Sequence, residues 1–466
     1  MDVDDVIAAI CTAPGVAGLA VLRVSGPGAL AVAGRVFRGA DLAAAPSHTL
    51  HHGWAWSAEP EARRLDEVVA AVFRAPRSYT GEDVVELSCH GGRLSAERVL
   101  DALRAAGARL ARPGEFTLRA FLRGRIDLAQ AEAVADVIHA ETSAAHRLAL
   151  DQLAGSLSRA LVGIENRVLD ALAEVEARVD FAEDVGGVEA PPHVRSAVRA
   201  VAAELDALRR GSAWARAVRE GVRVPIVGRP NVGKSSVFNA LLGEERAIVA
   251  AIPGTTRDRV SEPLELGGVR VVLSDTAGLR ETSDAVESIG IERARATLDE
   301  SRIVLWVVDG STPLLDADLA VGRALAGKQV LLVLNKRDLG AAVERRTVLD
   351  ALSTAADVAI VAVSARDRSG LDDLRRALAT LLGLEDAAAV ESGAPRAVLA
   401  HARHVDAVAR ASAALERAAV AADDDLPGEV VALELREALD ALGEVTGRRV
   451  DADVLDRIFA RFCIGK

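Results

Sequence analysis

The chain has 466 residues and a formal net charge of −12, and 50% of its residues are hydrophobic. This length predicts about three domains, and the composition excludes a wholly disordered chain. No apolar run reaches the roughly 18 residues of a membrane span, and the acidic start Met1–Asp5 does not resemble a secretory signal. The three cysteines, Cys11, Cys89 and Cys463, are far apart, which excludes a disulfide framework and favours the reducing cytoplasm.

Charge is spread unevenly along the chain. Residues 1–125 are nearly neutral and residues 221–385 are slightly acidic, so most of the acidic excess lies in 126–220 and 386–466. No segment is strongly basic. If a nucleic acid is a partner, bulk charge is not what attracts it.

The first segment, 1–125, predicts a mixed α/β domain. Apolar runs over 18–24, 67–73 and 84–88 end in Gly, Pro or Ser turn signals and are therefore expected to be strands. The pattern then changes to a helix over about 94–106.

Helical periodicity begins near residue 127 and continues to about 179, with Leu128, Ala131, Ala135 and Ile138 on one helical face. After a break at Gly186–Gly187 and Pro191–Pro192, a further helix is expected over about 194–218. Helices return at the end of the chain, over 398–422, 427–442 and 452–462.

Strands and helices alternate over 221–385, which predicts a doubly wound, largely parallel sheet. The expected strands are 222–227, 269–273, 303–308, 330–334 and 358–363. The simplest organisation is a helical domain in two parts, 126–220 and 386–466, interrupted by an inserted α/β domain.

A phosphate-binding motif follows the first of these strands. Residues Gly228–Ser235 match GxxxxGK[ST] between a predicted strand and a predicted helix, which is the context the motif requires. Its backbone N–H groups can wrap phosphates, Lys234 can reach the β and γ oxygens, and the Ser235 hydroxyl can bind Mg²⁺.

Three more motifs follow, each after a strand, and the four in this order are typical of translation-factor-type GTPases. Asp275–Gly278 can hold Mg²⁺ through water and face the γ-phosphate. A carboxylate in Asn335–Asp338 can read the N1–H and 2-amino groups of guanine, which favours GTP over ATP, and Ser364–Arg366 supports the base. The motifs predict these GTP-binding residues: Asn231, Val232, Gly233, Lys234, Ser235, Ser236, Asp275, Thr276, Ala277, Gly278, Asn335, Lys336, Arg337, Asp338, Ser364, Ala365 and Arg366.

The catalytic group is less obvious. Many small GTPases have a glutamine after Asp-x-x-Gly to orient water, whereas this chain has Leu279, which cannot do so. Positive charge near the β–γ bridge is also needed. Arg257 in cis or a bound monovalent cation can supply it.

The full set of motifs resembles the MnmE (TrmE) family of tRNA modification GTPases. The resemblance rests on Asn231 in the phosphate loop, the Gly254–Asp258 switch, Asp275–Arg280 and the final Phe462–Lys466, Phe-Cys-Ile-Gly-Lys. Further segments of the same kind are 75–92, 111–116 and 127–132, so the resemblance spans the whole chain.

The resemblance implies an N-terminal α/β domain (1–125) that binds folate and dimerises, a discontinuous helical domain and an inserted GTPase domain. It implies a homodimer that joins the flavoprotein MnmG, which uses FAD and NADH, in a heterotetramer. The complex would add a carboxymethylaminomethyl-type group to carbon 5 of the wobble uridine in certain tRNAs. A tetrahydrofolate derivative, 5-formyl or 5,10-methylene, would supply the one-carbon unit.

The resemblance also implies ion and catalytic residues. The switch adds Ala250, Ala251, Ile252, Pro253, Gly254, Thr255 and Thr256 to the GTP-binding set. Potassium would be held by Asn231, Ala250, Ile252 and Thr255, and magnesium by Ser235 and Thr256. Glu287 would be the catalytic glutamate, acting with Lys234.

The folate site implied by the resemblance consists of Arg23, Glu82, Arg125 and Lys466. A carboxylate suits the amide and amino edge of a pterin, and cations suit the glutamate tail. The family commonly has lysine in place of Arg125. Without the resemblance, the residue pattern predicts that Arg23 is a surface residue. It also predicts that Cys463 is a small buried hydrophobic residue.

Two other function classes compete with this interpretation. A ribosome-assembly GTPase would share the nucleotide motifs, but such proteins append a basic RNA module, and the helical segments here are acidic. A scaffold that binds GTP without hydrolysing it is disfavoured by Thr256 and Glu287. Folate binding would discriminate between the first two classes.

Overall fold

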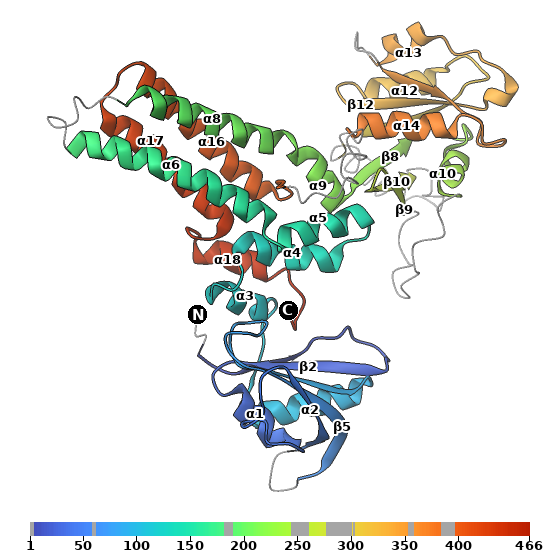
Figure 1. Cartoon of the computed structure of the whole chain (residues 1–466). Helices are drawn as coiled ribbons and strands as arrows, with labels where there is room; N and C mark the ends of the chain where they lie inside the picture. Colours follow the sequence, from blue (N-terminus) through green and yellow to red (C-terminus); the bar gives the residue numbers. More distant parts are fainter. Residues whose placement is uncertain are drawn as a thin grey trace. The chain divides into compact units, whose positions relative to one another are not determined.

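The computed structural model describes residues 4–57, 62–180, 190–243, 261–275, 301, 303–352, 358–383 and 397–466 (Figure 1). Its contacts divide the chain into two compact units built from separate stretches of sequence. Unit 1 contains Met1–His139, Ala149–Asp206 and Asp406–Lys466, and unit 2 contains Ala140–Leu148 and Ala207–Val405. No helix in the described ranges has the length and apolar character needed to span a membrane.

Unit 1 begins with a seven-stranded sheet in the order β3-β4-β5-β6-β2-β1-β7 within the described residues. Only the β1–β7 pair is parallel in this sheet. The three strands predicted here are confirmed with slightly shifted ends, whereas β1, β3, β4 and β7 were not predicted. The strands are β1 (Ile7–Ile10), β2 (Leu19–Ser25), β3 (Phe37–Arg38), β4 (Thr49–Trp56), β5 (Arg64–Phe73), β6 (Val84–His90) and β7 (Arg109–Leu110).

Helices α1 (Ala29–Val36) and α2 (Arg93–Ala105) pack on one face of this sheet. Leu22 and Leu87 point toward these helices and are fully buried. Since successive side chains of a strand alternate between faces, the neighbours Arg23 and Glu86 lie on the other face. That second face carries the candidate site described below.

The other helices of unit 1 come after the sheet in the sequence. Among them, α6 and α17 lie side by side (Figure 1). The helix predicted over 194–218 is wrong as a single element, because the chain breaks at Gly211 into α8 and α9; glycine is a poor helix former. The helix predicted to reach residue 462 ends at Phe459. Ile138, which the periodicity placed on the same helical face as Leu128, is 44% exposed. The helices are α3 (Glu115–Leu122), α4 (Leu128–His139), α6 (Ser156–Asp180), α8 (Pro192–Arg210), α16 (Ala402–Asp423), α17 (Gly428–Thr446) and α18 (Ala452–Phe459).

Unit 2 contains a six-stranded sheet in the order β13-β12-β11-β8-β10-β9 within the described residues. The five predicted strands are confirmed, and their pairs are parallel. The strand β9 was missed because it is an antiparallel edge strand that contains Pro263 and alternates with charged residues. The strands are β8 (Val222–Val227), β9 (Ser261–Leu266), β10 (Val269–Asp275), β11 (Ile303–Asp309), β12 (Gln329–Asn335) and β13 (Ala359–Ala362).

Helices α10 (Lys234–Leu242), α12 (Asp316–Ala324), α13 (Arg345–Ala351) and α14 (Leu371–Leu381) accompany this sheet. Two elements from the sequence before the sheet also belong to unit 2. Helix α9 (Ser212–Glu220) and the start of α5 (Ser143–Leu153) contribute Ala145, Leu148, Ala215 and Val218 to its core. The Thr142 hydroxyl donates to the Gly268 carbonyl in the β9–β10 turn at 2.8 Å.

Candidate functional site

The phosphate loop connects β8 to α10 at the carboxyl end of the sheet, where ligands bind in doubly wound folds. Gly228 has φ +148°, and a Cβ there would lie 2.1 Å from the Val307 carbonyl oxygen, so a side chain is excluded. Asn231 and Gly233 also have positive φ, +63° and +94°. The loop therefore has the curled backbone that turns N–H groups toward a phosphate.

Lys234 is buried at the start of α10. Its Nζ donates to the carbonyl oxygens of Gly228 and Arg229, at 2.8 and 2.9 Å. These bonds hold the ammonium group inside the loop. A bound nucleotide could replace the two carbonyl oxygens with phosphate oxygens as acceptors. A contact that the sequence did not reveal supports the loop from outside, because Arg229 donates to the buried Asp318 carboxylate at 3.0 Å.

The guanine motifs meet the phosphate loop through Asn335. Its Nδ2 donates to the Val232 carbonyl at 2.9 Å, and its Oδ1 accepts from the Ala365 backbone N–H at 3.1 Å. One buried amide thus joins three motifs that are distant in the sequence.

Asp338 and Lys336, two residues predicted to bind GTP, follow the end of β12. The Asp338 carboxylate is exposed, and no bond within the described chain occupies it. Lys336 donates to Asp309 at 2.7 Å. Burial opposes ionisation of Asp309, but hydrogen bonds from Lys336 and Ser311 outweigh it and lower the pKa of Asp309.

The structure describes only some of the other residues that are predicted to bind GTP or catalyse its hydrolysis. Ser235, Ser236, Arg337 and Arg366 are exposed and Ser364 is buried. Asp275 ends β10, although its side chain lies outside the described residues, as do the following predicted positions: Ala250, Ala251, Ile252, Pro253, Gly254, Thr255, Thr256, Arg257, Thr276, Ala277, Gly278, Leu279 and Glu287.

A second candidate site lies on the face of the unit 1 sheet opposite to α1 and α2. A pocket of about 400 Å³ opens between the strand ends and the β5–β6 loop. Its wall combines aromatic, aliphatic and charged side chains, as small-molecule pockets do. The lining residues are His48, Phe73, Arg77, Ser78, Tyr79, Val84, Glu86 and Arg125.

Three of the predicted folate residues meet at the ring of Tyr79. The guanidinium of Arg23 lies 4.4 Å from the ring centroid, that of Arg125 lies 5.4 Å away, and the Lys466 Nζ lies 5.9 Å away. Tyr79 was not predicted as part of the site. Its hydroxyl shares a 2.9 Å hydrogen bond with Thr117 of α3, which fixes the ring.

The final pentapeptide reaches this site from the far end of the chain. Phe462 is buried against Phe459. Gly465 has φ +101°, and a Cβ there would lie 2.7 Å from the Ile10 carbonyl oxygen. The Lys466 carbonyl accepts from the Phe116 backbone N–H at 3.2 Å. These contacts hold the end of the chain beside Tyr79, whose ring centroid lies 5.9 Å from the Lys466 Nζ.

Glu82 and Glu86 have different surroundings. Arg23 pairs with Glu86 at 2.8 Å across β2 and β6, and Glu86 lines the pocket. Glu82 is not among the lining residues and is 5% exposed. Its carboxylate accepts from Ser25, Arg119 and Arg123, so both oxygens are occupied.

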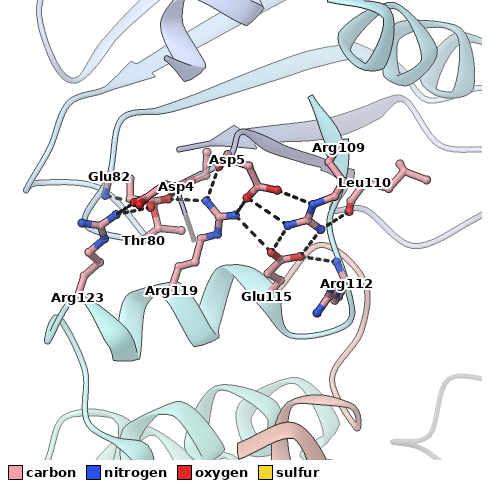
Figure 2. A network of polar contacts seen from close by, with 11 residues as sticks. Asp4, Asp5, Thr80, Glu82, Arg109, Leu110, Arg112, Glu115, Arg119 and Arg123 are labelled. Atoms are coloured by element: carbon pink, nitrogen blue, oxygen red, sulfur yellow. Dashed lines mark hydrogen bonds and ion pairs between the residues drawn. The ribbon is translucent and has the colours of Figure 1, made fainter. Parts of the chain in front are cut away.

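Glu82 belongs to a partly buried ionic network that ties α3 to the strands (Figure 2). Arg119 of α3 is 1% exposed and bonds Glu82, Asp5 and Glu115. Burial opposes ionisation of Glu115, but hydrogen bonds from Arg109 and the Arg112 backbone outweigh it and lower its pKa. This network fixes the helix that carries Phe116 and Thr117.

The three cysteines differ in accessibility. Cys463 is exposed, whereas burial raises the pKa of Cys89 to about 11 and also raises that of Cys11. Cys463, rather than a buried hydrophobe, is thus an accessible thiol. Within the described residues no cluster of histidine, cysteine and carboxylate side chains has the composition of a metal site.

Comparison with known proteins identifies the family. The model of the MnmE helical domain matches residues 128–463, and that of the GTP-binding protein TrmE N-terminus matches residues 6–125. The tRNA modification GTPase MnmE of Moorella thermoacetica is 45% identical over 99% of this chain and 100% of its own length. The chain belongs to the MnmE family of tRNA modification GTPases.

Other members of the MnmE family are similar over their whole length. The protein of Heliobacterium modesticaldum is 43% identical and covers 100% of both chains. Among solved structures, the FeoB G-domain of Methanococcus jannaschii is 25% identical, with a TM-score of 0.26 over 35% of this chain and 97% of its own. Aquifex aeolicus Era, bound to GDP and aluminium fluoride, is 30% identical, with a TM-score of 0.26 over 35% of this chain and 56% of its own.

Proposed function

We propose that this chain hydrolyses GTP to drive modification of carbon 5 of the wobble uridine in certain tRNAs. The family membership supports the GTPase and tRNA modification activities. The observation that carries the folate part is the pairing of Arg23 with Glu86 beside a ring surrounded by cations. A one-carbon donor and a nucleotide thus bind in separate units of the chain.

The nucleotide half of the proposed mechanism uses groups of the phosphate loop and of the strand ends beside it. The loop at Gly228–Gly233 wraps the phosphates, Lys234 neutralises their charge, and Asp338 accepts hydrogen bonds from guanine. The Ser235 hydroxyl at the start of α10 and the Asn231 amide fit Mg²⁺ and K⁺ respectively, since both cations take oxygen ligands. When bound, these cations stabilise the charge that develops between the β- and γ-phosphates.

The proposed ion and catalytic set is completed by residues of the switch segments. Thr256 would join Ser235 at magnesium, and Ala250, Ile252 and Thr255 would join Asn231 at potassium. Glu287 would orient the attacking water, since Leu279 cannot. The sequence motifs support these assignments.

The folate half uses the pocket of unit 1. We place the pterin edge of a 5-formyl- or 5,10-methylene-tetrahydrofolate on Glu86, because a carboxylate with a free face accepts from the ring amide and amino groups. Glu82, the carboxylate expected from the family resemblance, holds α3 instead. Arg125 supplies a cationic wall, Lys466 adds a second cation near the Tyr79 ring, and Cys463 lies three residues before Lys466.

The proposal includes partners. The chain would act as a homodimer with the flavoprotein MnmG, whose FAD and NADH supply the redox chemistry, in a heterotetramer in the cytoplasm. The experiment is the nucleoside profile of tRNA from cells that lack this protein. We expect the aminomethyl-type uridine to disappear, to return with the wild-type gene, and to stay absent with Glu86→Gln or Asp338→Asn. An unchanged profile with a defect in ribosome assembly would support the other GTPase class.

A further inference from the structure

The pocket of unit 1 has two ends, an inner end at Glu86 and an outer end at Arg77. Glu86 pairs with Ala71 of β5, and two residues along β6 Val84 pairs with Phe73, the last residue of β5. Two residues of a strand span about 7 Å. Beyond Phe73 the chain enters the β5–β6 loop, where Arg77 lies exposed on the rim.

The two ends differ in how their charges are balanced. At the inner end, Glu86 is neutralised by Arg23 at 2.8 Å. Arg125 donates to the Tyr79 carbonyl, a neutral partner. Within the described part of the chain, Arg77 takes part in no hydrogen bond or ion pair, although it lines the pocket. The outer end therefore presents a cation with no protein counter-ion.

The middle of the pocket is apolar. Phe73 and Val84 face each other across the strand pair, and the His48 ring stands edge-on to Phe73 with centroids 5.4 Å apart. A ligand that fits the whole pocket therefore has a hydrogen-bonding edge, a flat apolar middle and an anionic end. A volume of about 400 Å³ is at the small end for ligand pockets, so a long anionic end would extend past the rim.

We propose that Arg77 binds the γ-linked carboxylates of a polyglutamylated tetrahydrofolate and makes this chain prefer the polyglutamate form. The inference rests on the proposed folate site and adds the form of the ligand. The fused ring occupies the inner end at Glu86, the benzoyl group packs on Phe73, and the tail leaves over the rim. Each added glutamate brings another carboxylate to the unpaired guanidinium.

The test compares 5-formyl-tetrahydrofolate with one and with three glutamates, titrated calorimetrically into the full chain. We expect the triglutamate to bind roughly 3- to 10-fold more tightly, as suits one partly exposed charged hydrogen bond. Arg77→Ala should weaken the triglutamate more than the monoglutamate, so that the two ligands bind with nearly equal affinity. Arg77→Lys should keep part of the preference, and added salt should reduce it.

Arg98→Ala is the matched control, since Arg98 is an exposed arginine on α2, the helix that covers the opposite face of the sheet. It should keep the full preference. Equal binding of the two ligands by the wild type would overturn the inference while leaving the folate site standing. The inference would also be overturned if Arg77→Ala kept the preference for the triglutamate. It would likewise be overturned if the variant kept that preference and lost tRNA binding instead. If neither ligand binds the wild type, the proposed folate site itself fails.

Discussion

Glu86 and Arg23 lie opposite each other on β6 and β2 and form a 2.8 Å ion pair on the sheet face that lines the pocket. Glu86→Gln keeps the shape of the side chain and removes the charge that attracts the pterin amide and amino groups. We expect folate affinity to fall by about 1.5–3 kcal/mol, the range for a hydrogen bond to a charged group. Calorimetry with 5-formyl-tetrahydrofolate measures it, and unchanged GTP binding shows that unit 2 is intact.

Glu82 should behave as a structural residue. Glu82→Gln leaves the buried Arg119 with less compensating charge and should destabilise unit 1 by about 2–4 kcal/mol, as breaking a buried pair does. Urea unfolding checks this value. Glu97→Gln on the exposed face of α2 is the control and should change stability little. A folded Glu82→Gln protein of normal stability that has lost folate binding would return Glu82 to the ligand site.

The network around Glu115 makes stability depend on pH. Because its folded pKa lies below the ordinary value of 4.5, Glu115 stabilises the protein above that pH and loses this contribution as the pH falls through the folded pKa. Glu115→Gln should cost about 2–3 kcal/mol at pH 7. The cost should shrink as the pH falls below 4.5, which urea unfolding at pH 7, 4.5 and 3.5 can follow. A cost independent of pH would contradict this account.

The exposed carboxylate of Asp338 gives a nucleotide prediction. Asp338→Asn replaces a charged acceptor with an amide and should weaken GTP binding by about 1.5–3 kcal/mol. Xanthosine triphosphate, which has a carbonyl where guanine has its amino group, should bind the variant better than GTP does. Affinity for GTP that stays at the wild-type value in a folded variant would mean that another group reads the base.

Asn231 provides the test of the cation. Its positive φ holds it within the phosphate loop, and the amide is proposed to bind K⁺. We expect fast hydrolysis in potassium, slow hydrolysis in the smaller sodium, and loss of the potassium effect in Asn231→Ala with GTP still bound. G-domain dimerisation with a transition-state mimic should likewise require potassium. Arg257→Ala should retain much of the stimulation; equal rates in both salts and a collapse on removing Arg257 would favour an arginine finger.

The sequence predicted those parts of the fold and site that local signals encode. The strands of unit 2 are apolar runs and the phosphate loop has fixed spacing, so both were found. The edge strand β9 was missed because Pro263 and charged neighbours hide an antiparallel edge. In the proposed folate site, Glu82 and Glu86 lie in one short segment, and only the three-dimensional pairing shows which of them faces the pocket. Tyr79 and Arg77 lie in the 75–92 segment that carries the family resemblance, but only the structure shows that both line the pocket.

The start of α5 lies far from the GTPase motifs in sequence, yet Thr142 bonds the β9–β10 turn, and Ala145 and Leu148 complete the core of unit 2. The inserted segment 221–385 therefore does not form the core of unit 2 on its own. A chimera that exchanges only residues 221–385 with a relative would mismatch these contacts and those of α9. Grafts that carry 140–148 and 212–220 along with the GTPase core should fold where the simple exchange fails.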